Sequence, residues 1–112
     1  MLNRLYSPAY DQGVTLQLKE IVWYRKFVDK IEKKHNVSIE EVEEALFNKP
    51  VFRKVHRGKI KGEDAYIAYS RTFEGRYLFI VLIYKLNNTA IVVTARDMSP
   101  RERRYYNAHK KD

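Results

Sequence analysis

The fold is decided by residues 76–96, which read RYLFIVLIYKLNNTAIVVTAR. Residues 76–85 and 89–96 are two apolar runs rich in Ile, Val and Tyr, and the turn sequence Leu86-Asn87-Asn88 separates them. β-Branched and aromatic residues favour strands, whereas Asn tolerates the backbone of tight turns. The stretch therefore predicts two antiparallel strands joined by a short turn, with residues 76–85 at the centre of a sheet.

Two further strands are expected on the N-terminal side of this pair. Residues 65–73 are again rich in aromatic and β-branched side chains, and Glu74-Gly75 is a turn signal of the hairpin type. Residues 51–57 form a weaker candidate that carries several charges, which is typical of an edge strand. Glycines at positions 58 and 62 indicate a turn between these two segments. Together the four segments predict a four-stranded antiparallel sheet.

Two helices are expected before the sheet. Apolar residues recur at helical spacing over residues 24–31, which predicts a helix to about Lys34 with Asn36 as its left-handed C-terminal cap. Ser38 and Glu41 form a capping box that begins a second helix, and the following Lys-Pro pair at positions 49 and 50 ends it.

A third helix is expected after the sheet. Ser99 and Glu102 form a second capping box with Pro100 at the first helical position, so this helix begins near Pro100 and runs to about His109. Two helices, four strands and a helix make an α+β domain. We assign residues 19–112 to one domain and residues 1–18 to an irregular N-terminal arm, although residues 19–23 could form a short strand.

The charge is concentrated in one half of the chain. The 112 residues carry a net charge of +8, and residues 49–112 alone have fifteen Lys and Arg against six Asp and Glu. The segment 21–48 carries five basic and six acidic residues. A polyanionic partner such as RNA, DNA or an acidic protein would be attracted to the basic half, and the alternative is a basic surface without a specific partner.

Several classes of function are disfavoured by composition. The chain has no cysteine, which removes disulfides, thiolate metal sites and cysteine nucleophiles. Its three histidines are dispersed, so neither a metal nor another cofactor is expected. The N-terminus lacks a continuous apolar region, and the longest apolar run, Tyr77 to Tyr84, is too short for a membrane helix. We therefore expect no membrane association and a cytoplasmic location.

Three motifs occur in a fixed order along residues 21–108. The first is Trp23, followed eleven residues later by the run KHNVS and the Glu-rich segment 40–44. The second is the run GRYL at residues 75–78, and the third is TARDMSPRERRYY at residues 94–106. Together they resemble the BrnT family of bacterial toxins, whose fold is similar to that of RelE ribonucleases. The family's Glu-Glu-Arg motif is replaced here by Glu63-Asp64-Ala65, which indicates a divergent branch.

The resemblance implies a RelE-like fold and a toxin of a type II toxin-antitoxin pair. Such a toxin is a metal-independent endoribonuclease that cleaves mRNA, and a cognate antitoxin protein binds and neutralises it. The reaction needs a base for the 2′-hydroxyl, an acid for the leaving 5′-oxygen and cations for the phosphoryl oxygens.

Three residues are candidates for catalysis. The first is His35, because an imidazole can act as a base or an acid near neutral pH. The alternative for His35 is a half-buried residue that packs between two helices. Arg76 and Arg96 stand at strand ends, where their planar guanidinium groups could contact phosphate. For both arginines the alternative is an ion pair with a local carboxylate such as Asp97 or Glu74. Glu63 is a weaker candidate base, with an exposed turn carboxylate as the alternative.

A further set of residues is predicted to bind nucleic acid: Lys34, Arg101, Arg103, Arg104, Tyr105 and Tyr106. Cations in the first turns of a helix oppose the helix dipole, and binding of an anion would explain their presence. A solvated basic face is the alternative for the arginines. The tyrosines could stack on bases, although one of them is expected to pack against the sheet.

Two other functions compete with the ribonuclease. A non-catalytic RNA- or protein-binding module on the same fold would use the same basic half of the chain. A domain whose surface charge has no ligand role is the remaining alternative. A homodimer is compatible with each of these interpretations.

Overall fold

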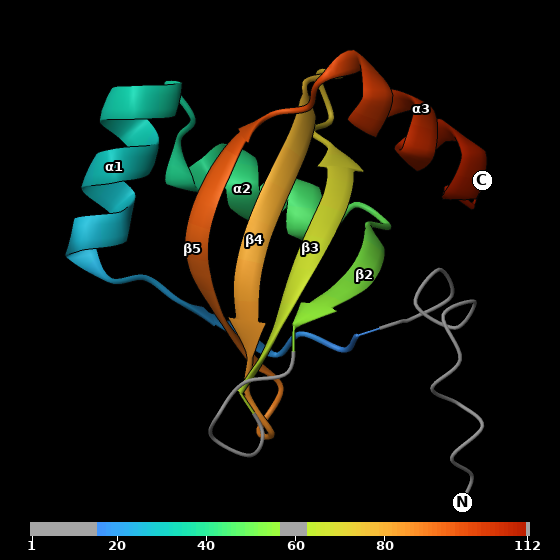
Figure 1. Ribbon diagram of the computed structural model, residues 1–112. Coiled ribbons are helices and arrows are strands. Elements are labelled where there is room, and N and C mark those ends of the chain that lie inside the picture. The colour runs from blue at the N-terminus through green and yellow to red at the C-terminus, as the bar shows by residue number, and fades with distance from the viewer. Residues whose placement is uncertain (1–15, 57–62, 112) are drawn as a thin grey trace, which may run out of the picture.

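The computed structural model describes residues 16–56 and 63–111. Within this part the elements are β1 (Glu20–Val22), α1 (Arg25–His35), α2 (Ile39–Leu46), β2 (Val51–His56), β3 (Asp64–Arg71), β4 (Tyr77–Tyr84), β5 (Thr89–Asp97) and α3 (Pro100–His109). Figure 1 shows a curved sheet with α2 behind it, α1 beside β5 and α3 at the opposite side. The predicted α+β class is confirmed, with two helices before the main strands and one after them.

The sheet has the strand order β1-β5-β4-β3-β2, so β4 is central and β2 lies at an edge, as predicted. The four predicted strands pair antiparallel as expected. The predicted number of strands is wrong, because β1, within the segment 19–23 named as a possible short strand, adds a fifth that pairs in parallel with β5. Its three residues are too few to show the alternation that identifies a strand in sequence. Its partner also lies far along the chain, since Glu20 is opposite Thr89.

The expected signals at the helix ends are present in the structure. Asn36 adopts the left-handed conformation with φ 54°, and the N–H of Val37 donates to the carbonyl of Ile31 at 3.4 Å. Both capping boxes form: the N–H of Glu41 donates to Ser38 Oγ at 3.1 Å, and the same reciprocal arrangement begins α3. These contacts join residues close in sequence, which explains why the helix boundaries could be predicted from the sequence.

Strand β3 ends at Arg71, two residues earlier than predicted, where the chain turns into the hairpin with β4. The hydroxyl of Thr72 accepts from the N–H of Arg76 at 3.0 Å, and the N–H of Gly75 donates to the Thr72 carbonyl at 2.9 Å. Gly75 has φ +96°, a conformation that suits glycine. The turn places Arg71 directly opposite Tyr77 across the two strands.

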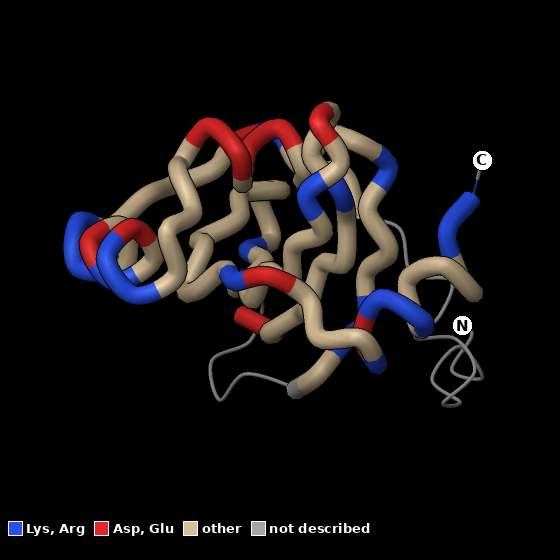
Figure 2. The backbone as a smooth tube through the Cα atoms, turned by 90° about the horizontal axis from the view of Figure 1, so that it is seen from above, with Lys and Arg blue, Asp and Glu red and all other residues tan. Residues whose placement is uncertain are grey.

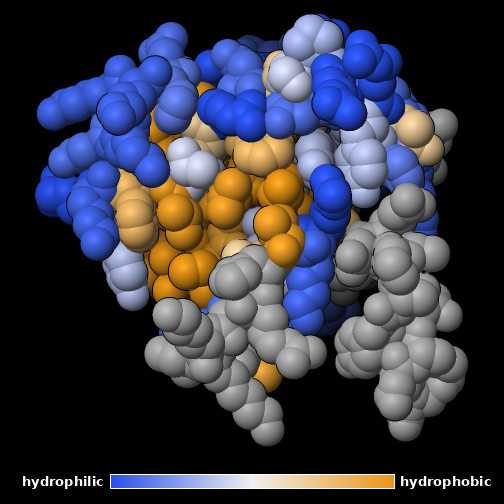
Figure 3. Space-filling view, in the orientation of Figure 1, coloured by the Kyte–Doolittle hydropathy of each residue, from blue (hydrophilic) through white to orange (hydrophobic). Residues whose placement is uncertain are grey.

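The two faces of the sheet are packed differently. Leu78, Ile80 and Leu82 of β4 are fully buried and face α1 and α2, together with the rest of the main core. The intervening β4 residues point to the other face, where α3 forms a second, smaller cluster. That cluster consists of Val51, Tyr69, Met98 and Tyr106, with Ile67, Tyr77, Phe79 and Tyr105 packed against it. This second face is only partly covered, and Figure 3 shows apolar residues gathered over its middle.

The segment before β1 also packs on the main core, through Leu16 and Leu18. Tyr84 donates a hydrogen bond to the carbonyl of Gln17 at 2.8 Å. The rest of the predicted arm, and the predicted turn at residues 58–62, lie outside the described residues. Within the described part, none of the helices is long and apolar enough to cross a membrane.

Candidate nucleic-acid interface

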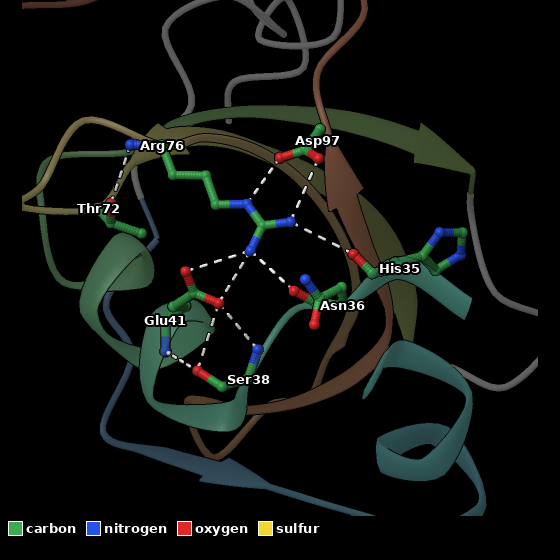
Figure 4. Close-up of polar contacts among 7 residues, drawn as sticks. All are labelled: His35, Asn36, Ser38, Glu41, Thr72, Arg76 and Asp97. Atoms are coloured by element: carbon green, nitrogen blue, oxygen red, sulfur yellow. Dashed lines mark hydrogen bonds and ion pairs between the residues drawn. The ribbon is translucent and has the colours of Figure 1, made fainter. Parts of the chain in front are cut away.

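Arg76 lies immediately before β4 and is surrounded by acceptors (Figure 4). Its Nε is 2.7 Å from one oxygen of Asp97, and its Nη2 is 3.2 Å from the other. Nη2 also donates to the carbonyl of His35 at 3.3 Å. Nη1 is 2.8 Å from the carbonyl of Asn36 and 3.0 Å from the carboxylate of Glu41. A guanidinium has five N–H donors, so the protein itself engages them all.

The charges around Arg76 stabilise one another. Hydrogen bonding from Arg76 lowers the pKa of Asp97. The backbone N–H of Ser38 is the main cause of the lowered pKa of Glu41, and Arg76 adds to it. Of the two interpretations open for Arg76, the ion pair with Asp97 is therefore the one that the structure shows. Arg76 joins the end of α1, the start of α2 and the end of β5.

His35 and Lys34 stand at the C-terminal end of α1. The backbone carbonyl of His35 faces Arg76, but its half-buried imidazole points away from the guanidinium (Figure 4). Lys34 is exposed. Since α1 packs against β5 and α3 against β3, these two residues do not join the predicted binding residues of α3.

Arg96 lies near the end of β5 and contacts the start of α3. Its Nη1 and Nη2 are 2.8 and 2.9 Å from the two carboxylate oxygens of Glu102, and Nη1 also donates to the backbone carbonyl of Asp97 at 3.1 Å. Its ion pair is thus with Glu102 and not with the carboxylate of Asp97 or Glu74. This pairing raises the pKa of Arg96 and lowers the pKa of Glu102. The guanidinium carbon lies 3.9 Å from the centre of the Phe79 ring. Arg96 is thus held against Phe79 on the second face of the sheet.

A groove of about 380 Å³ lies between α3 and this face of the sheet. We call it the α3 groove, and it is lined by Arg53, Ile67, Tyr69, Phe79, Arg101, Glu102 and Tyr105. Tyr105 packs on Tyr69 with ring centres 4.8 Å apart, and Tyr69 packs edge-on against Phe79 at 5.6 Å. The groove therefore has an aromatic floor and wall with cationic side chains around it.

Four arginines lie against aromatic rings in and beside the α3 groove. Arg53 lies 5.7 Å from the ring centre of Tyr105, and Arg96 lies against Phe79. The other two are Arg71 and Arg103, which both approach Tyr77. Attraction between a guanidinium and a ring face contributes about 0.5–1 kcal/mol at exposed sites. These contacts orient the cations along one surface.

The structure separates the predicted residues of α3 by their exposure. Arg101, Arg103 and Arg104 are exposed, whereas Tyr105 is half-buried. Tyr106 is only 4% exposed and packs edge-on against Tyr77 with ring centres 5.9 Å apart. Both tyrosines therefore pack against the sheet, where one was expected to do so. Tyr105 still lines the α3 groove.

His109 extends the aromatic side of the groove. Its ring lies 4.2 Å from that of Tyr105, and Nδ1 is 2.8 Å from the Tyr105 carbonyl. No sequence motif surrounds His109, so sequence reasoning left it without a role. Glu63, the other candidate base, instead forms an ion pair with Lys85. Glu63 lines a different hollow, which also contains Val22.

The sequence analysis also missed Arg53, Arg71, Tyr69, Tyr77 and Phe79. A usable signal was present, because alternate residues of a strand share one face. On that rule residues 67, 69 and 71 of β3 lie on the same face as residues 77 and 79 of β4, provided the hairpin register is known. The register depends on Thr72, whose side chain caps the turn.

Acidic and basic residues gather on different helices. Figure 2 shows the acidic residues of α2 on one side and the basic first turns of α3 on the other. The polar contacts of α2 include Trp23 Nε1, which donates to the carboxylate of Glu43 at 3.0 Å. The basic side is the surface toward which a polyanion would be attracted.

No family model matches the chain, and no curated protein matches it. Among the described residues, no group of three or more His, Cys, Asp or Glu is placed to hold a metal ion.

Proposed function

We propose that the chain binds single-stranded RNA in the α3 groove. The observation that carries the proposal is the set of arginines held against aromatic rings in and beside the groove. Single-stranded nucleic acid is recognised by aromatic rings that stack on bases and by cations that contact the backbone. A groove with both features, at the basic end of a chain of charge +8, suits this ligand.

RNA binding is tested by fluorescence anisotropy with a short unstructured RNA at increasing salt. We expect Tyr105→Ala to weaken binding about tenfold, since one base–aromatic stack contributes about 1–3 kcal/mol. Arg25→Gln measures the effect of removing one charge away from the groove, because Arg25 is exposed on α1. Folding of each variant is checked by its thermal unfolding. Equal affinity of the wild type and Tyr105→Ala would contradict binding in the groove.

Cleavage of the bound RNA is the second candidate function. It follows from the BrnT resemblance, with its RelE-like fold, and the observation that favours it is the imidazole of His109 beside Tyr105. In such a reaction a base removes the 2′-hydroxyl proton, O2′ attacks phosphorus, and an acid protonates the departing 5′-oxygen. His109 would act as base or acid at the groove. Arg96 would contact phosphate only if it left Glu102.

The toxin interpretation also draws support from contacts between its motifs. Trp23 contacts the Glu-rich segment through Glu43, and Arg76 contacts Glu41 of the same segment. The resemblance further implies a cytoplasmic toxin and a cognate antitoxin protein that covers its active surface. Growth arrest on expression, relieved by the neighbouring reading frame, would support this part of the proposal.

Cleavage is measured with purified protein and RNA in the presence of EDTA. We expect products with 2′,3′-cyclic phosphate and 5′-hydroxyl ends, and a loss of at least tenfold in rate for His109→Gln. His35→Gln is the comparison that separates the two histidines. Binding without cleavage would identify the chain as a non-catalytic RNA-binding module. Cleavage that survives both substitutions would remove His35 and His109 from the reaction.

A further inference from the structure

Two arginines converge on one tyrosine at the edge of the second face. Arg71 is the last residue of β3, Tyr77 is the first of β4, and Arg103 is in the second turn of α3. The guanidinium carbon of Arg103 lies 4.1 Å from the ring centre of Tyr77, and that of Arg71 lies 5.4 Å from it. Three elements therefore bring two positive charges to the same phenol.

This arrangement carries excess positive charge. Within residues 16–56 and 63–111, the ion pairs of the structure involve neither Arg71 nor Arg103. Two cations held near one ring repel each other, and an anion between them would remove that cost. By contrast, Arg76 and Arg96 have carboxylates within 3 Å.

The phenol of Tyr77 adds a hydroxyl group to the two arginines. Hydrogen bonding from Arg103, and then from Arg71, lowers the pKa of Tyr77. When guanidinium groups donate to the phenol oxygen, the phenol O–H is directed away from them. That O–H can then donate to an external acceptor. The structure thus brings the guanidinium groups of Arg71 and Arg103 to the ring that carries this hydroxyl.

The site is built on rigid supports. Arg71 and Tyr77 are opposite each other in the β3–β4 hairpin, whose turn is capped by Thr72. Buried Tyr106 packs edge-on against Tyr77 from α3. Binding therefore requires little ordering of the ring, which lowers the entropic cost of capturing a ligand.

We infer that Arg71, Tyr77 and Arg103 form a binding site for a phosphate group. Guanidinium groups bind phosphate oxygens through paired hydrogen bonds, which matches two arginines on either side of a hydroxyl donor. The inference deepens the proposed function and rests on it for the identity of the ligand, a phosphate of RNA. The phosphate can come from within the RNA backbone or from its 5′ end.

The site is tested first with inorganic phosphate alone. The arginine Nε–Hε signals are followed by NMR as phosphate replaces chloride at constant ionic strength. We expect saturable shifts of the signals of Arg71 and Arg103. Arg71→Gln and Arg103→Gln should each weaken binding at least tenfold, since a hydrogen bond to a charged group contributes about 1.5–3 kcal/mol. Tyr77→Phe keeps the ring, removes the hydroxyl and should weaken phosphate binding about fivefold.

Arg25→Gln on α1 removes the same charge elsewhere and should leave phosphate affinity within twofold of the wild type. An equal loss of phosphate affinity in Arg25→Gln and Arg103→Gln would mean that phosphate is attracted by the overall positive charge, and it would overturn the site. Absence of saturation in the wild type would overturn it as well. The Tyr77→Phe variant protects the test against misfolding, because its ring packing is retained.

RNA with and without a 5′-phosphate then distinguishes the two sources of the ligand. A 5′-phosphate that improves affinity in the wild type but not in Arg103→Gln indicates the terminal phosphate, and equal affinities that both fall in Arg103→Gln indicate the backbone. Saturable phosphate binding without RNA binding would refute the proposed function and leave the site standing. RNA binding that is unchanged in Arg71→Gln and Tyr77→Phe would refute the site and leave the proposed function standing.

Discussion

Arg76 and Asp97 form a two-point ion pair between the start of β4 and the end of β5, with N–O distances of 2.7 and 3.2 Å. The same guanidinium binds the carbonyls of His35 and Asn36 at the end of α1. It also reaches Glu41, whose carboxylate belongs to the capping box of α2. One side chain therefore joins both helices to the sheet.

Arg76→Gln is expected to lower the free energy of unfolding by about 2 kcal/mol. The substitution removes charge-assisted hydrogen bonds that are partly exposed, so their contribution is smaller than that of a fully buried pair. Urea unfolding of the variant and of the wild type measures the difference. Arg25→Gln, the exposed control, should lie within about 0.5 kcal/mol of the wild type. A similar small effect for both substitutions would contradict this role.

The contribution of Arg76 should vanish in acid. Asp97 and Glu41 have their pKa lowered from ordinary values of 3.8 and 4.5. A carboxyl with a lowered pKa in the folded state stabilises the fold above its ordinary pKa, and this stabilisation is lost as the pH falls through the lowered value. The stability difference between the wild type and Arg76→Gln should therefore be constant near neutral pH and shrink below about pH 4. A difference that grew on acidification would have the wrong sign.

Asn36 tests the end of α1 separately from Arg76, which binds only its backbone carbonyl. Asn36 has φ 54°, and a left-handed conformation costs a residue other than Gly, Asn or Asp roughly 1–2 kcal/mol. Asn36→Ala should therefore lower the free energy of unfolding by about 1 kcal/mol. Asn36→Gly should be neutral or slightly stabilising, because glycine suits this position. Thermal or urea unfolding of both variants and the wild type measures these differences in stability.

If the chain binds RNA as proposed, salt dependence will separate the arginines that contact RNA from those that hold the fold. Each lost phosphate contact reduces the slope of log affinity against log salt by about 0.7 for a single strand. Arg53→Gln and Arg101→Gln should therefore give shallower slopes, since both residues line the α3 groove. Arg76→Gln should leave the slope unchanged at temperatures where the variant is folded. A shallower slope for Arg76→Gln would indicate that Arg76 contacts a phosphate of the RNA.

The helix boundaries and the central hairpin could be predicted because their causes are local. Ser38 and Glu41, three residues apart, specify a helix start without reference to the rest of the chain. Asn36 specifies a helix end in the same way. The apolar run of β4 identified the central strand, because only a strand covered in the middle of a sheet is apolar on both faces.

The roles of the arginines could not be predicted, because their partners lie far along the chain. Arg76 meets Glu41 and Asn36 only after the sheet has formed against the helices. Strand-end position, the signal used for Arg76 and Arg96, does not distinguish a residue that faces a carboxylate from one that faces solvent. Arg71 was missed for a related reason, since its neighbour Arg103 comes from α3.

The parallel pairing of β1 with β5 has a consequence for the order in which the protein folds. Strands β2 to β5 follow one another as antiparallel neighbours and meet by closing short loops. The contact between Glu20 and Thr89 closes a loop of more than half the chain, at a greater cost in chain entropy. Pairings between distant segments slow folding, so β1 is expected to join the sheet last. With only three residues in its ladder, β1 is also the strand whose opening would disturb the remaining core least, and its amides should exchange with solvent first.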